Sequence, residues 1–110
     1  MLDGFTFDVI RWAVHTRAMI KTFADKETQS LFEGGSPRRF RAFQSVAERK
    51  LQQLDSAETL EFLRSPPGNR LEALKGDREG QYSIRINGQW RLCFRWADGD
   101  AYDVVIVDYH

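Results

Sequence analysis

The sequence predicts an α+β domain in which a helical hairpin packs against one face of a mainly antiparallel sheet. Two patterns predict this fold class. Between about residues 36 and 55, apolar residues recur at three- and four-residue spacing, as in an amphipathic helix. From Tyr82 to Trp96 they alternate with polar residues around Asn87-Gly88, as in a β-hairpin. With a strand expected at each end, the predicted order of elements is β-α-α-β-β-β.

The chain of 110 residues is predicted to hold one domain with a single core. Residues 1–18 fit poorly with the rest of the chain, whereas "MIKTFA" from Met19 starts afresh with the apolar-polar pattern of a strand. We therefore divide the chain into an N-terminal extension, 1–18, and a domain, 19–110. The extension is either a short extra element or the product of an upstream start codon, and we favour the second. A signal peptide begins with basic residues, whereas this segment carries Asp3 and Asp8, so it makes a poor signal peptide.

The helical hairpin is delimited by capping residues. Asp25 is a candidate N-cap, and Gly34-Gly35 suits the left-handed end of a first helix. Ser36-Pro37 then starts a second helix, which is expected to end near Asp55. The basic residues of this segment are interpreted as its solvated flank: Arg38, Arg39, Arg41, Arg49 and Lys50. Residues 63–81 are rich in proline and glycine and are expected to form loops.

The register of the hairpin follows from its apolar pattern. A two-residue Asn-Gly turn would pair Ile84 with Arg91 and place an arginine among the isoleucines. A three-residue loop, with Gly88 as the candidate left-handed residue, instead pairs Ile84 with Trp90 or Leu92. Ser83, Arg85 and Arg91 then share the face opposite the helices, while Trp90, Phe94 and Trp96 belong to the core.

The chain ends in "YDVVIVDYH". The run Val104–Val107 is expected in a strand that is covered on both faces or lies centrally. Three titratable residues come after it: Asp108, Tyr109 and His110.

Charge and cysteine content restrict the functional classes. The formal net charge is zero, but residues 62–96 carry seven cations against three acids, so one face can attract a polyanion without general affinity for DNA. Cys93 is the single cysteine, which excludes an intrachain disulfide and a multi-cysteine zinc site and suits the cytoplasm. His15 and His110 lie far apart in the sequence, and no metal-ligand cluster, phosphate loop or nucleophile elbow is evident. The sequence predicts neither a metal nor a cofactor.

One group of side chains can bind an anion. Its members are predicted to lie on or near the open face of the sheet: Arg70, Glu72, Lys75, Arg85, Arg91, Tyr109 and His110. Their cations can hold a phosphodiester, and Tyr109 or His110 can move protons. The competing interpretation is a solvated sheet face with a polar C-terminus. From the residues alone, this plainer interpretation is favoured.

The stretch "SPPGNRLEALKGDREGQYSIRINGQWRLCFRW", together with the terminal "VDYH", resembles the HigB toxins of the RelE superfamily, also called plasmid-maintenance-system killer proteins. The resemblance is greatest to their chromosomal GraT-type members, and it covers Met19 to His110. It implies a RelE-like fold and a type II toxin that acts as a ribosome-dependent mRNA endoribonuclease. It also implies inhibition of translation and growth, a cytoplasmic location, and neutralisation by a HigA-like helix-turn-helix antitoxin. A toxin–antitoxin heterotetramer would bind operator DNA through that antitoxin.

The resemblance also assigns roles to residues. Lys75 and Arg91 match family residues that contact the scissile phosphate, and Asp108, Tyr109 and His110 match the C-terminal active-site group. Glu72 departs from the histidine of "LHPLKG" in plasmid-borne relatives. It can act as a base or pair with Arg70. The expected RNA contacts are Arg70, Arg78, Arg85, Asn87 and Arg95.

The mechanism implied by the resemblance is attack of the ribose 2′-OH on the adjacent phosphate, with no metal required. The alternative is a RelE-like module that binds RNA, the ribosome or a protein without cleavage. Loss of cleavage in a folded Arg91→Ala protein would separate these two possibilities.

Overall fold

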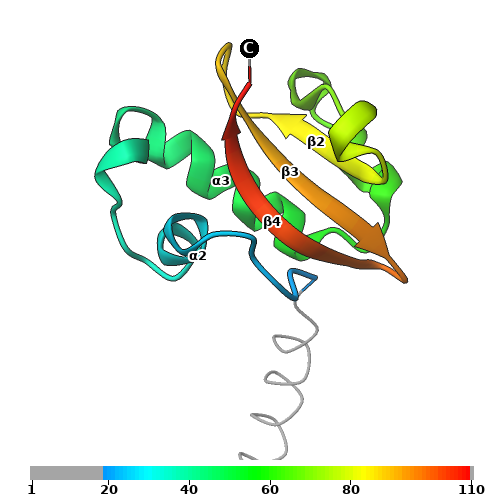
Figure 1. Ribbon diagram of the computed structural model, residues 1–110, viewed down its shortest axis with the longest axis horizontal. Helices are drawn as coiled ribbons and strands as arrows, with labels where there is room; N and C mark the ends of the chain where they lie inside the picture. Colours follow the sequence, from blue (N-terminus) through cyan, green and yellow to red (C-terminus); the bar gives the residue numbers. More distant parts are fainter. Residues whose placement is uncertain (1–18, 110) are drawn as a thin grey trace, which may run out of the picture.

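The computed structural model of the protein describes residues 19–109, so the extension 1–18 and His110 lie outside the described residues. The helices are α2 (Lys26–Phe32) and α3 (Gln44–Ser56), and the strands are β1 (Glu72–Ala73), β2 (Gln81–Arg85), β3 (Trp90–Ala97) and β4 (Asp100–Asp108). The strands form one antiparallel sheet in the order β1-β2-β3-β4. α3 crosses one face of this sheet and α2 lies beside β4 (Figure 1). The predicted α+β class is confirmed.

Short 3₁₀ helices connect these elements: Arg38–Phe43, Leu60–Arg64, Pro67–Asn69 and Gly76–Arg78. The last two of these, together with β1, interrupt the proline- and glycine-rich segment 63–81 that was expected to be loop. The core between α3 and the sheet contains fully buried side chains such as Phe40, Leu54, Leu92 and Phe94. Among residues 19–109, no helix is long and apolar enough to cross a membrane.

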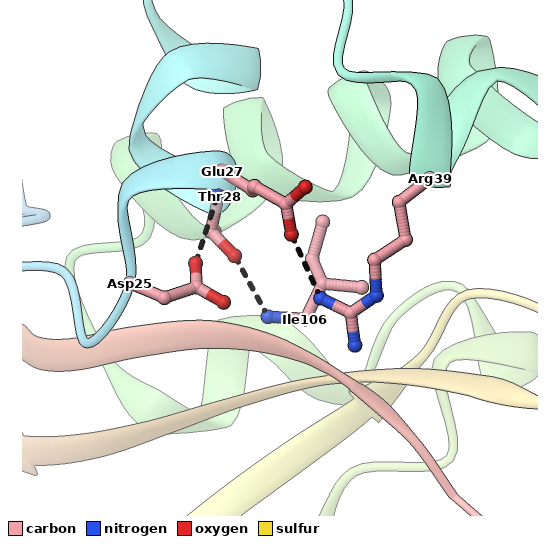
Figure 2. Close-up of polar contacts among 5 residues, drawn as sticks. All are labelled: Asp25, Glu27, Thr28, Arg39 and Ile106. Carbon is pink, nitrogen blue, oxygen red and sulfur yellow. Dashed lines mark hydrogen bonds and ion pairs between the residues drawn. The ribbon is translucent and has the colours of Figure 1, made fainter.

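α2 forms where its capping residues predict it. The Asp25 carboxylate accepts a hydrogen bond from the Thr28 amide at 2.8 Å, and Gly34 has a φ of 105°, the left-handed region open to glycine. Thr28, on the buried side of α2, accepts with its Oγ1 a hydrogen bond from the Ile106 amide of β4 at 3.0 Å. Figure 2 shows this bond beside the Asp25 cap. The hydroxyl therefore docks α2 onto β4 two residues before Asp108.

Thr28→Val is expected to reduce the free energy of unfolding by about 1–3 kcal/mol, because it leaves the buried Ile106 amide without an acceptor. Urea denaturation monitored by circular dichroism measures this loss. Thr22→Val is the matched control, since the Thr22 hydroxyl also accepts from a β4 amide, that of Asp103 at 2.8 Å, but in an exposed position. An equal or larger loss in the control would contradict the role given to Thr28.

The second predicted helix is divided. Residues 38–43 form a 3₁₀ helix, and the α-helix begins only at Gln44 before ending at Ser56, close to the predicted end. In a 3₁₀ helix, residues three apart lie in line. Phe40 and Phe43 thus both reach the Trp90 ring, with centroid distances of 5.9 and 5.0 Å. Packing on Trp90 accounts for the tighter helix.

The N-terminal strand expected at Ile20–Phe23 is present only as two isolated parallel bridges to β4, Ile20 with Ala101 and Phe23 with Val104. The Lys21 amide donates to the Ala101 carbonyl at 2.8 Å, and the Val104 amide donates to the Thr22 carbonyl at 3.0 Å. β4 is the last strand of the sheet, yet this segment covers its outer edge. That cover accounts for the β-branched run, which was expected in a strand that is covered on both faces or lies centrally.

The hairpin of β2 and β3 has the predicted three-residue loop. Ile84 pairs with Leu92 and Arg85 with Arg91, and the Ile86 amide donates to the Trp90 carbonyl at 2.9 Å. The prediction of a left-handed Gly88 was wrong, because its φ is not positive. The Asn87 side chain shapes the turn instead. Its Oδ1 accepts from the amides of Gln89 and Trp90, each at 2.8 Å.

Candidate active site around Arg91

Arg91 lies on the sheet face opposite α3, where the alternation of β3 places it, but its side chain is only 8% exposed. Its Nε donates to the Ser83 hydroxyl at 2.7 Å, and its Nη2 donates to the Arg70 carbonyl at 2.7 Å. Two segments of chain, β2 and the loop before β1, therefore hold the guanidinium. A buried cation bound in this way has a fixed orientation.

Two further side chains flank the Arg91 guanidinium. A Glu72 carboxylate oxygen of β1 lies 3.7 Å from Nη2. The Tyr109 ring, directly after β4, lies 5.5 Å from Cζ, in the geometry of a cation–π contact. Both groups are about half exposed, so a ligand on this face can reach them. The structure thus brings together Arg91, Glu72 and Tyr109, and the ion pair of Glu72 is with Arg91 rather than with Arg70.

Lys75 and Arg78 follow shortly after the strand β1, which carries Glu72. Lys75 is exposed and stands immediately before the 3₁₀ helix Gly76–Arg78. Arg78 donates from Nη1 to the Gln81 side chain at 3.1 Å. Burial raises the pKa of the Cys93 thiol, and the charges of Arg78 and Arg91 act in the opposite direction. Both cations therefore lie near enough to act on Cys93, the β3 residue two positions after Arg91.

Asp108 and Tyr109 point to opposite faces of the sheet. Asp108 pairs with Trp90, whose ring packs on Phe40 and Phe43, so its side chain lies on the helical face. Its carboxylate accepts from Gln89 Nε2 at 3.1 Å. Figure 1 shows this end of β4 beside the turn between β2 and β3. Asp108 is thus on the other side of the sheet from Arg91, while His110 lies outside the described residues.

The predicted RNA contacts are distributed over the open face and its rim. Arg85 lies directly opposite Arg91, the Arg70 side chain is exposed, and Arg95 forms an ion pair with Asp103 at 3.3 Å. Asn87 is used in the turn of the hairpin. Within residues 19–109, no three His, Cys, Asp or Glu side chains are grouped so that they could hold a metal ion.

The contact between Lys50 and Asn69 was not predicted from the sequence. Lys50 was interpreted as part of a solvated flank, but its Nζ donates to the Asn69 side chain at 2.6 Å, and burial, together with Arg49, lowers the pKa of this ammonium group. Asn69 is fully buried. The only available signal was the position of Asn69 directly after Pro-Pro-Gly, which marks a turn but not burial. Ser83, by contrast, was placed on the face of Arg91 by the register alone.

The arrangement of strands and helices matches solved structures of the protein YoeB from Staphylococcus aureus. The match to YoeB in its complex with YefM has a TM-score of 0.50 at 20% identity and covers 84% of this chain and 99% of that one. The YoeB dimer gives the same TM-score and identity, with 86% and 98% covered. At this identity the match shows the fold alone, which is an α+β fold shared with YoeB.

The sequence comparisons define the class and then the family. The family model for the RelE-like toxin of the type II toxin–antitoxin system HigB matches residues 21–110, so the chain is a RelE-like toxin of this type. It belongs to the HigB-like toxin family, which confirms the resemblance found in the sequence. Toxin HigB-1 of Vibrio cholerae is 41% identical over 85 residues, covering 76% of this chain and 90% of that protein. Endoribonuclease HigB of Proteus vulgaris is 39% identical over 94 residues, covering 84% and 100%. Membership in a type II family implies an antitoxin partner.

Proposed function

We propose that this protein is an endoribonuclease that cleaves mRNA on the ribosome and thereby inhibits translation and growth. The observation that carries the proposal is the Arg91 guanidinium, which is held rigidly between the Tyr109 ring and the Glu72 carboxylate on a face rich in cations. The name of the relative from Proteus vulgaris, Endoribonuclease HigB, supports it, since the alignment covers that protein completely.

The proposed reaction is attack of a ribose 2′-OH on the adjacent phosphate. A bond forms between O2′ and phosphorus, and the bond from phosphorus to O5′ breaks. The 2′-OH gives its proton to a base, and O5′ receives one from an acid, leaving a 2′,3′-cyclic phosphate and a 5′-OH. Glu72, Tyr109 and His110 are the candidates for these proton transfers. Arg91 and Lys75 stabilise the extra negative charge of the five-coordinate phosphate.

The proposal includes particular partners. Arg70, Arg78, Arg85 and Arg95 offer charge to the phosphates of mRNA and ribosomal RNA. The antitoxin is proposed to be HigA-like, with a helix-turn-helix domain through which a toxin–antitoxin heterotetramer binds operator DNA. A cytoplasmic location is part of the proposal, because ribosomes and their mRNA are there.

The test is cleavage by the purified protein of one mRNA, presented free and in a programmed ribosome. Cuts within codons on the ribosome, with a cyclic or 3′ phosphate and a 5′-OH at the new ends, are expected. Cleavage of free mRNA at the same rate would refute the ribosome dependence. A protein that binds the programmed ribosome and leaves the mRNA intact would refute the enzyme.

A non-catalytic module that binds the ribosome or RNA is the second candidate. It is favoured by one observation, the engagement of both Nε and Nη2 of Arg91 by protein groups. On this interpretation Arg91 is a structural cation. If growth arrest persists in a folded Arg91→Ala variant and no new RNA ends appear, the protein is a non-catalytic binding module.

A further inference from the structure

The loop that meets Arg91 is anchored by one buried carboxamide. Asn69 has no exposed surface, although it ends the short 3₁₀ helix Pro67–Asn69 in the loop before β1. Its Nδ2 donates to the Gln53 side chain of α3 at 3.1 Å and to the Leu63 carbonyl at 3.1 Å. Its Oδ1 accepts from Lys50 Nζ of α3 at 2.6 Å. A buried polar group whose donors and acceptor are all engaged allows the loop one position relative to α3.

The backbone directly after Asn69 is unusual. Arg70 has φ 47° and ψ 58°, the left-handed conformation that residues other than glycine rarely adopt. This turn directs the Arg70 carbonyl to Arg91, whose Nη2 lies 2.7 Å from it. Surrounding contacts must hold such a conformation in place, and the nearest anchored side chain along the chain is that of Asn69, directly before it.

We propose that Asn69 is a positioning residue for Arg91. It acts through the Arg70 carbonyl, which together with the Ser83 hydroxyl fixes both Nη2 and Nε and therefore the plane of the guanidinium. The inference rests on the proposed function, in which Arg91 stabilises the phosphate. Through Asn69 and the Arg70 carbonyl, α3 on one face of the sheet is connected to Arg91 on the opposite face.

The first test needs no measurement of activity. In the full-length protein labelled with ¹⁵N-arginine, Arg91 is expected to give separate, slowly exchanging Nη1 and Nη2 NMR signals, because the bond to the Arg70 carbonyl hinders rotation. A single averaged Nη signal from Arg91 would overturn the proposal. Arg91→Lys, which removes the signals, assigns them.

The second test is Asn69→Asp. The carboxylate keeps an acceptor for Lys50 but loses both donors, so it faces the Gln53 and Leu63 oxygens without a hydrogen bond. The Arg91 Nη signals are expected to average, and kcat for cleavage on the ribosome to fall on the order of 100-fold with little change in KM, as for a misplaced catalytic group. Gln53→Leu removes one acceptor from Asn69 and is expected to act in the same direction more weakly, which provides a test if Asn69→Asp does not fold.

Leu31→Val on α2 is the control for lost stability, because it weakens the core without touching the Asn69 anchor. It is expected to keep both the split Nη signals and the parent kcat. Split signals and unchanged kcat in folded Asn69→Asp, or unchanged values in Gln53→Leu where Asn69→Asp is unfolded, would overturn the positioning role. Full cleavage by Arg91→Ala would instead overturn the role that the proposed function gives to Arg91, and the NMR results would still decide whether Asn69 fixes the Arg91 side chain.

Discussion

Arg91→Ala is expected to reduce kcat for cleavage on the ribosome by on the order of 10³-fold, as when a preorganised cationic group is removed from a phosphoryl transition state. The structural reason is the fixed guanidinium, which keeps its charge in place without reorganisation during the reaction. Arg91→Lys keeps the charge and loses the planar fork that bonds Ser83 and Arg70, so a large part of the loss is expected to remain. Single-turnover cleavage of mRNA in a programmed ribosome measures both variants.

Arg85→Ala is the matched control, because Arg85 pairs directly with Arg91 across the hairpin and lies on the same face. It removes an equal charge from the field that attracts RNA, so it should raise KM and leave kcat nearly unchanged. Circular dichroism must show that each variant is folded, since Arg91→Ala also leaves the Ser83 hydroxyl and the Arg70 carbonyl without their donor. If folded Arg91→Ala keeps the parent kcat, Arg91 is a structural cation.

The hairpin register could be predicted because it depends only on neighbouring residues. Side chains alternate with period two, and an arginine among isoleucines is unfavourable, so the pattern selected the pairing of Ile84 with Leu92. The conformation inside the turn was not determined by the same pattern. Gly88 can adopt a left-handed conformation, but the two hydrogen bonds accepted by Asn87 shape the loop without one.

Contacts between distant segments could not be predicted. Lys50 shares the spacing of the apolar residues of its helix, but as a cation it was interpreted as part of the solvated flank. Nothing in its neighbourhood indicates that its ammonium meets Asn69, nineteen positions later. The break before α3 likewise depends on Trp90, which packs on Phe40 and Phe43 from another element. Periodicity gives the face of an element, whereas such contacts arise only once the elements have packed.

The chemistry of the site could be predicted only in part, because periodicity gives the face on which a residue lies but not its contacts with distant segments. Alternation places Arg91 on the open face, and the group of candidate anion-binding residues already included Glu72 and Tyr109. Neither explains why an arginine on that face is buried. The loop before β1 covers it and supplies the Arg70 carbonyl, so the burial depends on a turn that has no periodic pattern.

Tyr109→Phe is the second large expected effect. It removes only the hydroxyl and keeps the ring beside Arg91, at 5.5 Å from Cζ in the parent. If the hydroxyl transfers a proton, kcat is expected to fall by about 10²-fold or more, since general acid–base catalysis contributes 10²–10⁴-fold. KM and the free energy of unfolding should change little, because Tyr109 is an exposed residue and its ring stays in place. The measurement is single-turnover cleavage as a function of pH.

Glu72→Gln and a chain ending at Tyr109 are the companion variants, because Glu72 and His110 are the other proton-transfer candidates. Loss of the base is expected to remove the rise of kcat as the pH increases. Loss of the acid is expected to remove the fall of kcat at high pH. Glu72→Gln also removes the negative charge that lies 3.7 Å from the Arg91 guanidinium. An effect on KM alone would therefore show that Glu72 balances the charge of Arg91 and does not transfer a proton. Parent kcat and an unchanged pH profile in Tyr109→Phe would exclude the Tyr109 hydroxyl from the reaction and leave its ring as a cover for Arg91.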